Sequence, residues 1–113
     1  MTVNPKVLSY IGLATRSRNI ASGEFSTEKA VKSGKACLVI VAEDASDNTK
    51  KMFQNMCTYY KVPIYFFGEK AQLGHAMGRE IRASMALLDK GLADAIEKQL
   101  KNGGSKYGEN ENI

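Results

Sequence analysis

The sequence predicts an α/β protein: a three-layer α-β-α sandwich around a four-stranded mixed sheet. Two observations predict this fold. Strand-like apolar runs alternate with segments of helical period along the chain, and Ala36–Ala42 is apolar at every position, as in a strand covered on both faces. The 113 residues, of which 43% are hydrophobic, suffice for one domain with a core, which we expect over residues 1–101. Residues 102–113, rich in Gly, Asn, Lys and Glu, are predicted to form a disordered tail.

The first helix begins at Asn4 and Pro5. Asparagine is a good N-cap, and proline fits the first helical position because its missing N–H has no helical partner there. The polar and basic segment Thr15–Asn19 ends this helix, and Ile20–Ala21 is predicted as a short strand. A second helix is predicted over residues 22–33, with an acidic residue in its first turn, where the helix dipole favours negative charge.

The middle of the chain is predicted to continue the alternation. After the strand Ala36–Ala42, a polar turn at 43–47 precedes a helix whose apolar face includes Phe53, and Ser46 or Asp47 can cap that helix. Val62–Pro63 ends that helix, because proline cannot continue it. The apolar run Ile64–Phe67 is predicted as a second buried strand.

The last third contains three further elements. A short helix is predicted over 70–77, followed by a turn at 78–82 and a strand over 83–88. Asp89 can cap a final helix, which carries apolar residues at helical spacing.

The positive charge is concentrated in one part of the chain. The net charge is +4, and residues 1–82 hold 12 basic against 7 acidic side chains, whereas residues 83–113 hold 4 against 5. This distribution favours an anionic partner for the first part. The N-terminus has no basic-then-apolar pattern, and no apolar run approaches the roughly 20 residues of a membrane helix. We therefore expect a cytoplasmic protein without a membrane partner.

The sequence lacks the residue patterns that catalysis and metal binding require. His75 is the single histidine, and the sequence contains neither a Gly-x-Ser-x-Gly nucleophile motif nor a phosphate-binding loop of the Gly-x-x-x-x-Gly-Lys type. One histidine and two cysteines do not supply a zinc site. The adjacent carboxylates Glu43 and Asp44 suit either Mg²⁺ or acid–base chemistry, with helix capping as the alternative. We expect no enzymatic activity, no metal and no cofactor.

Three loops are predicted to converge at one end of the sheet: 20–29, 42–46 and 73–82. The first contains a helix N-terminus at Gly23, whose backbone N–H groups suit a phosphate or a base edge. Lys29 follows further along the same helix. The alternative interpretation is a capped helix with solvated lysines.

The third loop combines guanidinium groups with an apolar side chain. Arg79 and Arg82 flank Ile81. Such a combination suits splayed-out RNA bases, which stack and pair outside a groove.

Several segments that follow one another along the chain resemble those of the kink-turn RNA-binding ribosomal protein family L7Ae, with its relatives L30e and S12e. The resemblance covers roughly residues 5–100, and two further segments are similar to the small bacterial branch of that family. The first set is Ser22-Gly23-Glu24, Lys29 to Ala36, Leu38 to Asp44, Val62-Pro63-Ile64, Leu73-Gly74 and Gly78-x-Glu80. The second set is Ile11-Gly12-Leu13-Ala14-x-Arg16 and Ala42-Glu43-Asp44-Ala45-Ser46-x-Asn48-Thr49.

This resemblance implies a protein that binds a sharply bent RNA internal loop through tandem sheared G·A pairs. The family motif Gly-x-Asn-Glu-x-x-Lys corresponds to residues 23–29, where Phe25 and Ser26 replace the Asn and Glu that read the G·A edges. Either Phe25 stacks on a base while Ser26 and Glu24 supply hydrogen bonds, or Phe25 belongs to the core.

The sequence thus predicts a non-catalytic RNA-binding protein, ribosomal or ribosome-associated, that recognises a kink-turn-like ribosomal or messenger-leader RNA. We expect a monomer, with ribosomal proteins as further partners. The alternative is a protein-interaction module of a ribonucleoprotein assembly that uses the same surface. The predicted RNA-binding residues are Arg16, Arg18, Gly23, Glu24, Phe25, Ser26, Lys29, Lys32, Glu43, Asp44, Arg79, Glu80, Ile81 and Arg82.

Overall fold

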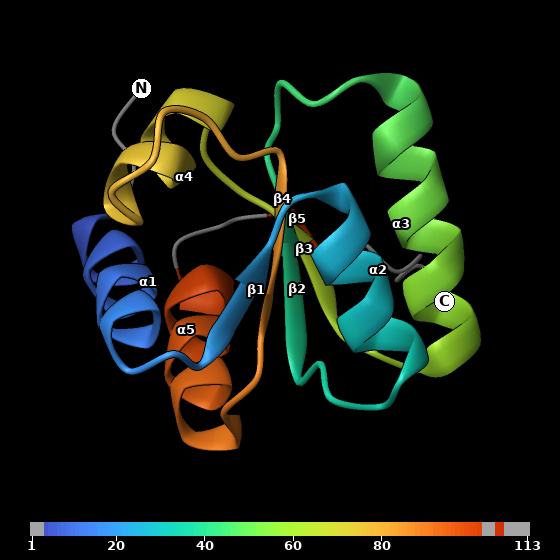
Figure 1. The fold of residues 1–113 in the computed structure, drawn as a ribbon, viewed down its shortest axis with the longest axis horizontal. Helices are drawn as coiled ribbons and strands as arrows, with labels where there is room; N and C mark the ends of the chain where they lie inside the picture. Colours follow the sequence, from blue (N-terminus) through green and yellow to red (C-terminus); the bar gives the residue numbers. More distant parts are fainter. Residues whose placement is uncertain (1–3, 103–105, 108–113) are drawn as a thin grey trace.

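The sheet stands on edge between two layers of helices (Figure 1). The computed structural model describes residues 4–102 and 106–107. One layer contains α1 (Pro5–Arg16), α4 (Lys70–Ala76) and α5 (Lys90–Asn102), and the other contains α2 (Glu24–Lys32) and α3 (Asp47–Tyr60). The predicted three-layer α-β-α sandwich is confirmed. Within the described residues, no helix combines the length and the apolar composition that crossing a bilayer requires.

Four main strands form the predicted mixed sheet. They are β1 (Ile20–Ser22), β2 (Leu38–Val41), β3 (Ile64–Phe66) and β4 (Ser84–Leu87). The strand order is β1-β4-β2-β3-β5, in which β2 runs parallel to β3 and antiparallel to β4, and β1 also runs antiparallel to β4. Because β1 and β2 run in one direction and β4 in the other, β1 and β2 end where β4 begins.

A fifth strand, β5 (Lys106–Tyr107), pairs antiparallel with β3. These two residues fall within the tail that the composition predicted to be disordered, so the structure differs from the prediction there. Because β2 pairs with the other side of β3, β5 covers the edge of β3 that the four main strands leave unpaired, and such an edge offers N–H and C=O groups to any segment that can reach it. The predicted tail also included Asn102, which ends α5; residues 103–105 and 108–113 lie outside the described residues.

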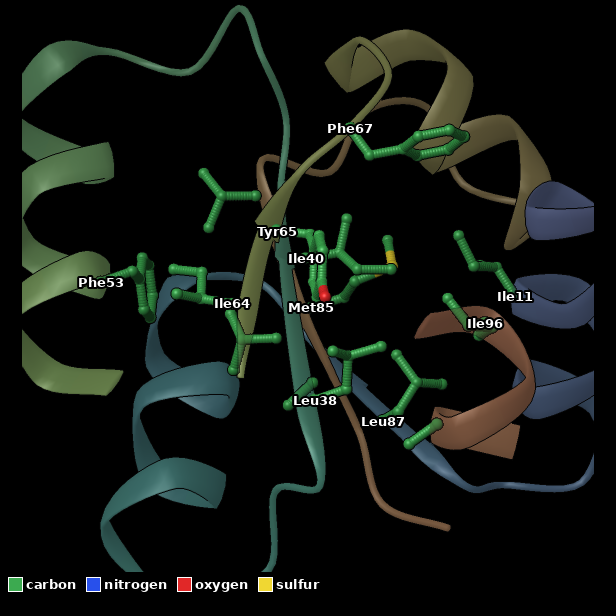
Figure 2. Packing of buried hydrophobic residues seen from close by; sticks show 14 of the residues in the cluster. Ile11, Leu38, Ile40, Phe53, Ile64, Tyr65, Phe67, Met85, Leu87 and Ile96 are labelled. Atoms are coloured by element: carbon green, nitrogen blue, oxygen red, sulfur yellow. The ribbon is translucent and has the colours of Figure 1, made fainter. Parts of the chain in front are cut away.

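The central strands are covered on both faces, as their uninterrupted apolar sequence predicted. All four residues of β2 are fully buried. Figure 2 shows Phe53 of α3 beside Ile64 on one face of the sheet, and Ile11 of α1 and Ile96 of α5 on the other. Tyr65 is also buried, and its hydroxyl donates a hydrogen bond to Glu97 Oε2 at 2.9 Å. Because both faces of the central strands are covered, the polar loops lie at the ends of the strands.

The helix starts agree with the predicted caps. The Asn4 side chain accepts a hydrogen bond from the N–H of Lys6, and the Ser46 hydroxyl accepts one from Thr49. Asp89 Oδ2 accepts from the N–H of Leu92 in the first turn of α5. These local hydrogen bonds fix where each helix begins relative to the sheet.

Candidate nucleic-acid interface

Three loops meet at the end of the sheet where β1 and β2 finish and β4 begins, which is the upper end in Figure 1. They are the start of α2 (residues 23–26), the β2–α3 loop (42–46) and the α4–β4 loop (77–83). We call the surface formed by these three segments the loop face.

The start of α2 depends on Gly23. Its φ of 90° lies in a region that L side chains rarely adopt, so glycine is required for this turn. The Gly23 N–H donates to the carbonyl of Ser84 at 3.0 Å, and the Gly23 carbonyl accepts from Thr27 at 3.0 Å. Because glycine has no side chain to cap the helix, the first N–H groups of α2 lack the usual N-cap acceptor.

A buried pair of hydroxyl groups holds α2 against β4. Thr27 and Ser84 are buried polar side chains, with relative exposures of 0% and 1%. The Ser84 hydroxyl donates to Thr27 Oγ1 at 3.5 Å. The pair places two polar groups beside each other inside the core, where α2 meets β4.

A chain of hydrogen bonds from Asp44 to Ser22 joins the β2–α3 loop, the α4–β4 loop and the end of β1, which directly precedes the start of α2. Asp44 Oδ1 accepts from the N–H of Lys70 at 2.8 Å, and the Lys70 carbonyl accepts from the N–H of Arg82 at 3.0 Å. Arg82 Nε then donates to Ser22 Oγ at 2.9 Å. Asp44 and Arg82 therefore both hold loops in position. We call this series the Asp44–Ser22 chain.

The α4–β4 loop lies directly on α4 at Gly74. A Cβ atom on Gly74 would lie 2.6 Å from Ile81 Cα and 2.7 Å from the Glu80 carbonyl oxygen, so only glycine fits. The Arg79 N–H also donates to the Gly74 carbonyl at 2.7 Å. With its backbone held in this way, the loop exposes the side chains of Arg79, Glu80 and Ile81, the last being 54% exposed.

The outer face of α2 carries a shallow groove beside the loop face. Phe25 is 77% exposed, so it does not belong to the core, and it lines a groove of about 400 Å³ with Glu28, Lys29, Lys32 and Ser33. Lys32 pairs with Glu28 at 2.7 Å. The hydrogen bond that Lys32 Nζ donates to that carboxylate, together with the carboxylate's charge, raises the pKa of Lys32. Among the described residues, Lys29 has no such carboxylate partner.

The structure brings most of the predicted site residues together and separates two of them. Arg18 lies in the turn after α1, and its neighbour Asn19 accepts a hydrogen bond from Leu88, beyond the far end of β4. Strand β1 therefore stands between Arg18 and the loop face. Arg16 lies over Gly12, in a second groove between α1 and α4 that His75 also lines. Lys29 and Lys32 line the groove on α2. The other predicted site residues all lie in the loop face: Gly23, Glu24, Phe25, Ser26, Glu43, Asp44, Arg79, Glu80, Ile81 and Arg82.

Sequence reasoning missed Ser22, Lys70 and Ser84 as positioning residues. Lys70 acts through its backbone N–H and carbonyl, which no side-chain pattern reveals. Ser22 and Arg82 are 60 positions apart, so their pairing has no local signal. Across residues 4–102, His, Cys, Asp and Glu side chains form no group of three that could hold a metal ion.

Three similarities to known proteins bear on this surface. Residues 5–97 match the "Ribosomal protein L7Ae/L30e/S12e/Gadd45 family". The "RNA-binding protein YlxQ" of Bacillus subtilis is 41% identical over 86 residues, which cover 76% of this chain and 86% of that protein. The "Large ribosomal subunit protein eL8" of Thermoplasma volcanium is 29% identical over 99 residues, covering 87% of this chain and 82% of that protein.

A solved structure agrees with the fold. The Giardia lamblia "15.5kD RNA binding protein" matches with a TM-score of 0.75 and 25% identity, over 87% of each chain. The resemblance in sequence and the arrangement of the helices around the sheet thus lead to the same family.

Asp44→Ala tests whether the Asp44–Ser22 chain holds the loop face. Removing the carboxylate takes away the acceptor of the Lys70 N–H, and we expect the free energy of unfolding to fall by about 0.5–1.5 kcal/mol. Amide hydrogen exchange at Arg82, whose N–H binds the Lys70 carbonyl, should become faster.

Glu43→Ala is the matched control, because it removes the same charge from the neighbouring exposed position. The control should change the free energy of unfolding by less than about 0.5 kcal/mol. Equal effects of the two substitutions would mean that charge, and not the hydrogen bond, is responsible.

Proposed function

The chain belongs to the ribosomal protein L7Ae/L30e/S12e/Gadd45 family, and on this basis we propose that it is a non-catalytic RNA-binding protein that docks its loop face on a structured RNA. One observation carries the proposal. The loop face combines uncapped N–H groups at the start of α2, the exposed cation Arg79 and the exposed apolar side chain Ile81. The names of the Bacillus subtilis YlxQ protein and of the Giardia protein support RNA as the partner.

Each part of the loop face suits a different part of an RNA. The uncapped N–H groups that follow Gly23 and the positive end of the α2 dipole suit a phosphate or a base edge. Lys29 and Arg79 suit phosphates, which supply most of the affinity in such complexes. Ile81 suits the face of an unpaired base, because single-stranded and bulged RNA exposes bases that a duplex hides.

The target that we propose is a kink-turn-like internal loop with sheared G·A pairs, in ribosomal RNA or a messenger leader. The archaeal relative named as a large ribosomal subunit protein supports a ribosome-related role. Ser26 and Glu24 are both exposed in the first turn of α2 and supply the hydrogen bonds to the base edges in place of the family's Asn and Glu. The protein acts as a cytoplasmic monomer, next to ribosomal proteins.

Binding to a kink-turn RNA tests this function most simply. The comparison is the same RNA with its G·A pairs replaced by Watson–Crick pairs, at two salt concentrations. We expect the kink-turn RNA to bind at least about tenfold more tightly, because each changed pair removes base-edge contacts. Equal and strongly salt-dependent binding to both RNAs would contradict the proposal. A protein that purifies without nucleic acid, together with another polypeptide, would favour an interaction module instead.

Lys29→Ala tests the phosphate contact. We expect weaker binding to all related RNAs and a salt dependence whose slope, log Kd against log salt, falls by about 1. Lys98→Ala provides the control, because Lys98 is exposed on α5, in the opposite helix layer. An unchanged affinity and slope for Lys29→Ala would show that RNA does not cross α2.

A further inference from the structure

We propose that the α2 groove, lined by Phe25, Glu28, Lys29, Lys32 and Ser33, holds one unpaired nucleotide of the bound RNA. The base stacks on the Phe25 ring and its phosphate lies against Lys29. This inference rests on the proposed function, and it adds a second contact surface beside the loop face.

The exposure of Phe25 is the first observation. An aromatic ring that is 77% exposed in the first turn of a helix contributes little to the core. Aromatic rings presented in this way are the usual stacking platforms for unpaired bases, since every base has an aromatic face. Phe25 belongs to both the loop face and the α2 groove, so one RNA can reach both.

The spacing along α2 is the second observation. Phe25, Lys29 and Lys32 occur at positions i, i+4 and i+7, which lie on one side of an α-helix. The groove between them has a volume of about 400 Å³, within the range of sites that take small organic ligands. The aromatic ring and the ammonium groups thus follow one another along the same side of α2. A nucleotide likewise has an aromatic base at one end and a charged phosphate at the other.

Charge decides between the possible occupants. Lys32 is paired with Glu28 at 2.7 Å, whereas Lys29 has no carboxylate partner among the described residues. The groove therefore offers one aromatic face and one unpaired positive charge. Most of the groove's surface is apolar, although its lining residues other than Phe25 are charged or polar, and this mixture suits the flat face of a base with its phosphate beside it.

A fluorescent base provides the test. The kink-turn RNA is prepared with 2-aminopurine at each unpaired position in turn, because its fluorescence falls when it stacks. We expect quenching at one position with the natural chain and none there with Phe25→Leu, which keeps apolar bulk but loses the ring. Phe25→Leu should also weaken RNA binding about tenfold.

Tyr59→Leu is the matched control. Tyr59 is also 77% exposed, but it lies on α3, where the centroid of its ring is 4.9 Å from that of the Tyr60 ring. This substitution should leave both the quenching and the affinity unchanged. Because both rings are exposed, neither substitution should move the thermal unfolding midpoint by more than a few degrees.

A coupling experiment sharpens the result. An abasic site at the quenched position should weaken binding of the natural chain about tenfold and should not weaken binding of Phe25→Leu further. If the natural chain prefers the kink-turn RNA, yet Phe25→Leu binds every probe equally well and no position is quenched, the groove proposal is wrong and the proposed function stands. If the natural chain shows no preference for the kink-turn RNA, the proposed function itself fails. Loss of a co-purifying polypeptide from Phe25→Leu, with RNA affinity unchanged, would make the groove a protein site and overturn the proposal.

Discussion

The Asp44–Ser22 chain is the constraint on which the rest of the loop face depends. Its three hydrogen bonds join the β2–α3 loop, the start of α4, the α4–β4 loop and the end of β1. Each bond contributes only about 1 kcal/mol to the free energy of unfolding. Their larger effect is on geometry, because a surface that is already ordered loses less conformational entropy when it binds a partner.

This constraint divides the charged residues at the end of the sheet into two groups. Asp44 and Arg82 hold the loops together, and Gly74 lets the α4–β4 loop lie directly on α4. Lys29 and Arg79, on the other hand, have no carboxylate partner among the described residues and are free to meet an anion. A basic residue near the site therefore does not necessarily contact the ligand. Its hydrogen bonds show whether it holds a loop in position or is free to bind.

Local patterns predicted the fold well because its elements are defined by local physics. The caps at Asn4, Ser46 and Asp89 and the apolar β2 lie where the sequence placed them. What the sequence did not reveal depends on contacts between distant segments. The position of Arg18 at the far end of β1, the exposure of Phe25 and the pairing of β5 with β3 follow from how the elements pack, which no short pattern records.

The most direct test of the account is a map of the RNA contact surface. Backbone amide signals would be followed by NMR while a kink-turn RNA is added to the isotope-labelled chain. We predict that the largest shifts fall on residues 23–26, 42–46 and 77–83, and that the amides around Arg18 and on α5 change little. Shifts centred on α5, or on the groove between α1 and α4, would contradict the claim that a loop face held by the Asp44–Ser22 chain binds the RNA.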